Sequence, residues 1–211
     1  MKKGCIPILI IVALILLIGG CGIKNSYNNM VTLDQNVQSQ WSQVENQYQR
    51  RADLIPNLVN TVKGAADFEK STLTQVIQAR ASATQIKVDP NDLSPEKIQQ
   101  FQQAQGQLSQ ALGRLMVVSE RYPELKANQN FRDLQAQLEG TENRITVARK
   151  DFNDAVQGFN TKIKRFPAVL WAGIFGFKEK GFFKAQAGAE TAPTVNFGNS
   201  NAAASADTTA P

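Results

Sequence analysis

Cys21 is the residue whose chemistry the sequence defines most clearly. It follows Ile18-Gly19-Gly20 at the end of an apolar run, which is the pattern that precedes a lipid-modified cysteine in lipoprotein signal peptides. On this interpretation the thiol is acylated and Cys21 becomes the mature N-terminus. The other cysteine, Cys5, lies inside the apolar run and is expected to do no chemistry. A mature lipoprotein would then have no disulfide, so packing alone must hold its fold.

Catalytic chemistry is poorly provided for in this sequence. The chain has 23 lysines and arginines, 18 aspartates and glutamates, and no histidine. Histidine is the usual acid or base near neutral pH and the commonest metal ligand. A di-iron helical bundle needs Glu-x-x-His pairs, and no pair of Glu-x-x-Glu segments replaces them on the apolar seams. We therefore expect no catalytic residue, cofactor or metal, with a metal-carboxylate bundle enzyme as a remote alternative. The small positive excess does not indicate nucleic-acid binding.

A polar cluster around residue 53 has two interpretations. Arg50, Arg51, Asp53 and Asn57 could form a docking surface at the end of a helical bundle farthest from the membrane. Alternatively, Asp53 caps a helix, Arg51 lays its stem over the core, and Asn57 bonds free backbone groups at a turn. The second interpretation is favoured, because every helix end leaves backbone groups that need partners.

The N-terminus indicates attachment to a membrane. Lys2 and Lys3 precede an uncharged stretch from Gly4 to Ile23, so the chain beyond it should lie on the extracytoplasmic, periplasmic side of a bacterial membrane. About 20 uncharged residues could instead be retained as a transmembrane helix. Three glycines near Cys21 weaken such a helix, and the lipoprotein interpretation is therefore slightly preferred. In both cases membrane lipid is a partner.

Composition divides the chain into three parts. Residues 1–23 form the anchor or signal segment, and residues 24–185 are long enough for one helical domain with a real core. Residues 186–211 lack lysine and arginine and are rich in alanine, threonine, asparagine and serine. Such a composition buries too little apolar surface to offset its ordering entropy, so a disordered tail is expected.

Apolar residues recur with the seven-residue period of coiled coils, which predicts an all-α fold. The inward positions are Val37, Trp41, Val44, Tyr48, Ile55, Leu58, Val62 and Ala65 in the first stretch; Ile98, Phe101, Leu108, Leu112, Leu115 and Tyr122 in the next; and Phe131, Leu134, Leu138, Ile145, Ala148, Phe152, Ala155, Phe159 and Phe166 in the last. We expect the phenylalanines to be core residues, since burial explains a heptad-spaced stripe completely.

Turn signals divide these stretches into helices. Asp89-Pro90 and Ser94-Pro95 predict a turn followed by a capped helix start, and Tyr122-Pro123 predicts a helix end. At Asp53-Leu54-Ile55-Pro56 the chain could either break or continue as one kinked helix, because Pro56 removes a hydrogen bond while the heptad phase runs on. A break gives segments of about 30, 30, 27 and 36 residues, suited to an antiparallel up-down-up-down four-helix bundle, which is the fold we predict.

An aromatic and basic stretch follows the last predicted helix. In the predicted topology this stretch returns to the membrane, where rings and ammonium groups suit the headgroup region. The candidate membrane contacts are Trp171, Phe175, Phe177, Lys178, Lys180, Phe182 and Phe183. Alternatively, the rings fold back and cap the open end of the bundle, and the sequence supports both interpretations equally.

Several segments together resemble the LemA family of bacterial membrane-anchored proteins. They are Tyr27-Asn28, residues 49–64, residues 122–127, Glu142-Asn143-Arg144-Ile145, Ala148-Arg149, Phe152-Asn153, Phe166-Pro167 and residues 172–177, within roughly residues 26–184. The resemblance implies an N-terminal anchor and a helical bundle outside the cytoplasm, without an agreed biochemical activity. Ala65, Phe152 and Phe159 stand where tyrosines are frequent in the family, so no role for those hydroxyls carries over.

The function that we predict is an interaction or accessory module at the cell envelope. The protein would be tethered to the membrane, would carry no catalytic site, and would offer a surface to an envelope protein. Glutamines such as Gln99, Gln100, Gln102, Gln103 and Gln107 could contribute contacts, although solvated helix surface explains them more simply. The alternative is a structural lipoprotein that binds or shapes the membrane surface.

Overall fold

The computed structural model describes residues 5–64 and 68–185, which are helical apart from turns and one extended C-terminal segment. The helices are α1 (Cys5–Lys63), α2 (Lys70–Gln85), α3 (Pro95–Ser119), α4 (Pro123–Ala127), α5 (Gln129–Lys164) and α6 (Ala168–Ala172). These residues contain no strand, which confirms the all-α prediction. The tail predicted at residues 186–211 lies outside this description.

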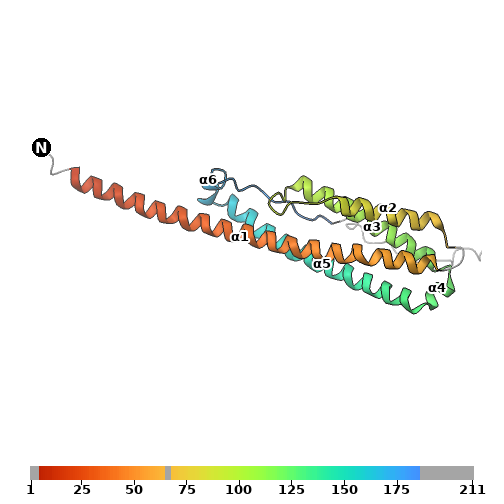
Figure 1. Ribbon diagram of the computed structural model, residues 1–211. Coiled ribbons are helices and arrows are strands. Elements are labelled where there is room, and N and C mark those ends of the chain that lie inside the picture. Colours follow the sequence, from red (N-terminus) through yellow and green to blue (C-terminus); the bar gives the residue numbers. More distant parts are fainter. Residues whose placement is uncertain (1–4, 65–67, 186–211) are drawn as a thin grey trace, which may run out of the picture.

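Two helix pairs make up the body of the molecule. The long helix α1 pairs extensively with α5, and α2 pairs with α3 to form a hairpin that lies against α1 (Figure 1). After α5, the short helix α6 contacts α1 again, and α1 extends well past α6 toward its N-terminus (Figure 1). The end of the body that contains α6, called the α6 end below, is therefore the end from which the N-terminal part of α1 projects.

The N-terminal segment is described mainly by its backbone. Among the described residues, no helix meets the length and apolarity required for a membrane span. Residues 1–4 lie outside the description, as do most side chains between residues 5 and 19. Cys21 is exposed and lies within α1.

The heptad pattern identifies the core correctly along most of the chain. The inward residues predicted in α1, α3 and α5 are buried, except that Ala65 lies outside the described residues and Tyr122 is half-buried. Phe166 departs from the pattern, because α5 ends at Lys164 and leaves the Phe166 side chain 81% exposed. The row of buried side chains on α5 therefore ends at Phe159 and Ile163, one helical turn before the position that the sequence suggests.

The predicted turn before α3 is also present. Asp89 accepts a hydrogen bond from the Asn91 backbone N–H at 2.8 Å, and α3 begins at Pro95 with Ser94 as its N-cap residue. The Ser94 side chain itself makes no capping bond. At the other end, α3 stops at Ser119, shortly before the predicted Tyr122-Pro123 boundary.

The predicted break at Asp53–Pro56 is wrong. Helix α1 runs through Pro56 to Lys63, and the next helix, α2, begins only at Lys70. The reason is a tertiary hydrogen bond. Because Pro56 has no N–H, it leaves the carbonyl of Ala52 without its helical donor. Arg80 of α2 supplies the missing donor, with its Nε 2.8 Å from the Ala52 oxygen.

We expect Arg80→Met to lower the free energy of unfolding by about 1–3 kcal/mol, because the buried Ala52 carbonyl loses its partner. In a Pro56→Ala background a backbone N–H becomes available to this carbonyl. Arg80→Met should therefore lower the free energy of unfolding by less in that background. A double-mutant cycle by urea denaturation measures the difference. Equal costs in the two backgrounds would show that Arg80 does not compensate for Pro56.

Candidate functional site

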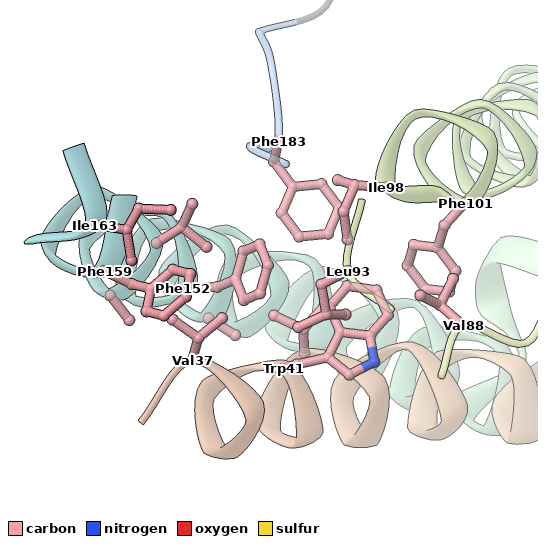
Figure 2. Close-up of a cluster of buried hydrophobic side chains, with 14 of the residues drawn as sticks. Val37, Trp41, Val88, Leu93, Ile98, Phe101, Phe152, Phe159, Ile163 and Phe183 are labelled. Atoms are coloured by element: carbon pink, nitrogen blue, oxygen red, sulfur yellow. The ribbon is translucent and has the colours of Figure 1, made fainter. Parts of the chain in front are cut away.

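A polar layer separates two hydrophobic clusters inside the body. One cluster, near the α6 end, contains Trp41, Phe152 and Phe159 (Figure 2), and the other contains residues such as Ile55 and Phe131. Polar side chains lie between them on three helices: Arg51 on α1, Gln105 and Ser109 on α3, and Glu142 on α5. The heptad repeats of α1 and α3 continue through Arg51 and Gln105, and these two side chains are buried as a result.

Arg51 is the centre of this layer. Its Nη1 donates to Glu142 Oε2 at 2.8 Å and to Ser109 Oγ at 2.9 Å, while Nη2 donates to Gln105 Oε1 at 2.8 Å. The Arg51 side chain is 2% exposed, whereas that of Glu142 is 53% exposed. A buried charge is costly unless it is paired and hydrogen-bonded. These partners pair the charge and bond both terminal nitrogens, while Nε is buried without a hydrogen-bond partner, and they connect α1 to both α3 and α5.

The ring of Tyr48 completes the surroundings of the Arg51 guanidinium group. The Tyr48 ring centroid lies 4.9 Å from the Arg51 guanidinium carbon, a cation–π distance. Burial raises the pKa of Tyr48, and the nearby charges of Arg149 and Arg51 act in the opposite direction. The phenol is therefore neutral near pH 7.

An open groove of about 690 Å³ lies beside the polar layer. Amide side chains of α3 line much of it, and Arg51 and Glu142 contribute to its wall. The lining amides belong to Gln99, Gln102, Gln103, Gln105, Gln107 and Gln110. The amides of Gln102 and Gln105 are hydrogen-bonded within the protein. The other four are exposed, and each carries both donors and acceptors, so the groove suits a partner that presents peptide groups or other uncharged polar groups. We call it the glutamine groove.

The structure separates the proposed docking residues into two groups. Arg50, Asp53 and Asn57 share one exposed face of α1, where Asp53 accepts a hydrogen bond from Gln49 Nε2 at 2.8 Å. Arg51 faces inward. None of the four lies at a helix end, since α1 continues to Lys63. The interpretation in which Asp53 caps a helix and Asn57 lies at a turn is therefore wrong.

After α6 the chain runs back over the body as an extended strap, residues 178–185. Three amide side chains hold its backbone, each accepting from the N–H and donating to the C=O of a single strap residue. Asn160 holds Lys180 at 3.0 and 2.9 Å, Asn153 holds Phe183 at 2.9 and 2.9 Å, and Gln102 holds Lys184 at 3.0 and 2.8 Å. These bonds satisfy backbone groups that an isolated extended segment would otherwise leave to water.

Two strap side chains are part of the interior. Phe183 points from the strap into the cluster of Figure 2, with its ring centroid 5.5 Å from that of Phe152 and 6.1 Å from that of Trp41. Lys180 is 8% exposed and pairs with Asp34 of α1 at 2.9 Å. Gly181 permits this close seating, since a Cβ at that position would lie 2.6 Å from Pro95 Cα.

The candidate membrane-contact residues therefore have different environments. Lys180 and Phe183 are buried, which leaves neither side chain available to a lipid surface in this structure. Trp171 and Phe177 are half-buried, and Phe177 packs against the core cluster. Phe175, Lys178 and Phe182 are exposed, and Phe175 makes an edge contact with Tyr27 of α1 at 4.9 Å between ring centroids.

Sequence reasoning missed the residues that hold the strap. Asn153 and Asn160 are seven residues apart and follow Phe152 and Phe159 directly in the sequence. An asparagine pair in register with an apolar stripe is the available signal, because a polar residue beside a core seam needs a fixed partner. That partner is an irregular segment, which heptad analysis cannot detect.

No group of three or more histidine, cysteine, aspartate or glutamate side chains is placed to hold a metal ion within residues 5–64 and 68–185. The acidic residue of the polar layer, Glu142, is committed to Arg51. Among the described parts of the chain, the glutamine groove and the face formed by Arg50, Asp53 and Asn57 are thus the candidate sites, and both are suited to binding.

Comparisons with known proteins agree with one another. The sequence model of the LemA family matches residues 40–197. The magnetosome proteins MamQ 1 and MamQ 2 of Paramagnetospirillum magneticum are each 28% identical to this chain over 182 residues, covering 78% of this chain and 67% of each relative. The protein LemA of Metamycoplasma hominis is 27% identical over 139 residues, covering 65% of this chain and 60% of the relative.

Proposed function

Because the chain belongs to the LemA family, we propose that it is a membrane-anchored helical module of the cell envelope that binds a protein partner and catalyses no reaction of its own. The family match confirms the resemblance seen in the sequence. In this proposal the N-terminal segment holds the protein at the membrane, and residues 24–185 lie on the extracytoplasmic side. Similarity to proteins named as magnetosome proteins and as LemA supports association with a membrane.

The continuity of α1 is the observation that carries this proposal. One unbroken helix leads from the uncharged N-terminal stretch into the core, and Met30 is its first hydrophobic core residue among those whose side chains are described. Its N-terminal part projects beyond the body (Figure 1). A helix whose C-terminal part packs into the body, and whose uncharged N-terminal stretch extends from it, suits a rod that joins a membrane to a folded domain.

The proposal includes a body of four antiparallel rods. The rods are α1, α2, α3 and α5, in up-down-up-down order. The pairing of α1 with α5, of α2 with α3 and of α1 with α2 supports this assignment (Figure 1). An even number of rods brings the end of α5 back beside the membrane-proximal part of α1, which agrees with the contact between α6 and α1.

We propose the glutamine groove as the principal partner surface, with the exposed face of Arg50, Asp53 and Asn57 as a second surface. The groove offers many uncharged donors and acceptors around a fixed polar layer. Polar groups that are already positioned give specificity at a small entropic cost on binding. The partner would therefore be a protein segment that presents backbone amides and carbonyls to the groove.

Site-specific photo-crosslinking in membranes tests this proposal. A photoreactive residue at Gln103 lies in the groove, one at Asn57 lies on the second surface, and one at exposed Gln78 on α2 is the matched control. We expect a discrete crosslinked partner from Gln103 and none from Gln78. If all three positions give no product while the protein stays in the membrane fraction, the partner-binding role is wrong, and the structural lipoprotein becomes the better account.

A further inference from the structure

The α6 end of the body carries an exposed apolar surface that the sequence does not reveal. Phe166, Val169, Leu170 and Ile174 are 81, 47, 55 and 73% exposed. Helix α6 turns Ala168 and Ala172 inward and leaves Val169 and Leu170 outside. We call these four residues the α6 patch. Contiguous exposed apolar residues in a folded protein commonly mark a contact surface.

Position relative to the N-terminal segment identifies what the patch contacts. Phe175, directly after Ile174, packs on Tyr27 of α1 at 4.9 Å between ring centroids. Tyr27 lies four residues after Ile23, the last residue of the uncharged stretch, which is about 6 Å along a helix axis. The headgroup region on each side of a bilayer has a similar thickness of about 5–8 Å. A helix anchored through this stretch would hold the patch at headgroup depth.

Charge around the patch fits an anionic lipid surface. Between residues 155 and 185 the chain has six basic residues, Lys162, Lys164, Arg165, Lys178, Lys180 and Lys184, against the single acid Glu179. Glu179 is paired with Lys164 at 2.6 Å, and Lys180 is paired with Asp34. Among the described residues, Lys162, Arg165 and Lys178 have no carboxylate partner within ion-pair distance. Lys24 on α1 is likewise exposed, whereas Asp92 lines the same surface hollow as Lys178, so the excess of basic residues in this part of the chain is modest.

We propose that the α6 patch is a second membrane contact, inserted into the headgroup region of an anionic leaflet beside the N-terminal anchor. The apolar side chains would enter between lipids, while exposed basic residues of the same segment, such as Arg165 and Lys178, would meet phosphate groups. Two attachments would fix the tilt of the body relative to the bilayer, and a single anchor helix would leave this tilt free. The inference rests on the proposed membrane anchoring, because the anchor supplies the orientation.

Native tryptophan fluorescence of the full chain in vesicles tests this contact. Vesicles of phosphatidylcholine and phosphatidylglycerol carry bromine near the top of the acyl chains, which quenches nearby indoles. The difference between the chain and its Trp171→Phe variant isolates Trp171, adjacent to the patch. We expect Trp171 to be quenched in anionic vesicles, and less so in pure phosphatidylcholine or at high salt, because salt screens the charge attraction.

Variants test whether the quenching of Trp171 depends on the α6 patch or on any exposed apolar residue. The Leu170→Ser and Ile174→Ser double variant should lose the Trp171 quenching. Val117→Ser with Val147→Ser, at positions 72 and 59% exposed on other faces, should keep it. If the double variant is unstable, Ile174→Ser alone provides the same comparison at the more exposed of the two substituted positions.

Flotation with vesicles, measured in the same samples, distinguishes a failure of the patch contact from a failure of the N-terminal anchoring. A chain that floats with vesicles while Trp171 stays unquenched would overturn the patch contact and leave the anchor intact. A chain that does not float would overturn the anchoring, and with it the contact. Quenching of equal strength in the Leu170→Ser, Ile174→Ser variant would also contradict the assignment to the patch.

Discussion

Replacing Arg51 with alanine is expected to lower the free energy of unfolding by about 3–5 kcal/mol. The change removes a large buried side chain between two hydrophobic clusters and takes the hydrogen-bond donors away from Gln105 and Ser109. Glu142 loses its ion partner but remains half-exposed and can be hydrated. Urea denaturation followed by the fluorescence of buried Trp41 measures the loss.

The neighbouring residue provides a matched control. Arg50 is exposed on the same helix, and Arg50→Ala should change stability by less than about 0.5 kcal/mol. Arg51→Met keeps most of the side-chain volume but none of the hydrogen-bond donors. Its loss of stability should lie between those of Arg50→Ala and Arg51→Ala. If Arg51→Ala proves no more destabilising than Arg50→Ala, the polar layer does not hold the α2–α3 hairpin on the rest of the body.

Replacing Phe183 with alanine is expected to cost about 3–4 kcal/mol, since its ring fills the space between Trp41, Phe101 and Phe152. The change also removes the contact between the strap and the core, so water should reach the indole of Trp41. Thermal unfolding should therefore begin at a lower temperature. At the same time, the Trp41 emission of the folded protein should shift to longer wavelength.

Phe182 is the matched control for this second prediction. It is the same residue type one position earlier in the strap, but its side chain is 40% exposed. Phe182→Ala should leave both the emission maximum and the unfolding midpoint nearly unchanged. Asn160→Ala should reproduce part of the Phe183→Ala effect, because it leaves the buried Lys180 backbone groups without partners. Equal effects of Phe182→Ala and Phe183→Ala would contradict the seating of the strap in the core.

Periodicity predicted the helical core well because burial imposes the seven-residue repeat locally. Trp41, Leu108 and Phe152 are all buried as expected, and each belongs to a helix in which sequence neighbours set the register. The family resemblance was likewise visible in short motifs and is confirmed by the family match. These are properties that a stretch of chain carries by itself.

The error at Pro56 shows what local reasoning lacks. Proline does cost a helical hydrogen bond, but the donor that replaces it, Arg80, lies 28 residues after Ala52, whose carbonyl it satisfies. No pattern around residue 56 reveals this donor. The misplaced turn made the second predicted segment too long, since α2 begins only at Lys70.

The candidate site was predictable in part for the same reason. Arg51 lies at an apolar heptad position of α1, where a charge demands a partner. Its ionic partner Glu142 is 91 residues away and belongs to another helix. The strap was missed because an extended segment has no repeat, and its bonds run to Asn153, Asn160 and Gln102 on two different helices.

The central claim is that the helical body lies outside the cytoplasm and is held at the membrane by its N-terminal segment. Protease treatment of spheroplasts that express the full chain, followed by fractionation, tests this claim most directly. We predict that the protein sediments with membranes and that an impermeant protease degrades the body without lysis. A body that resists digestion until the cells are lysed, or that appears in the soluble fraction, would contradict the account.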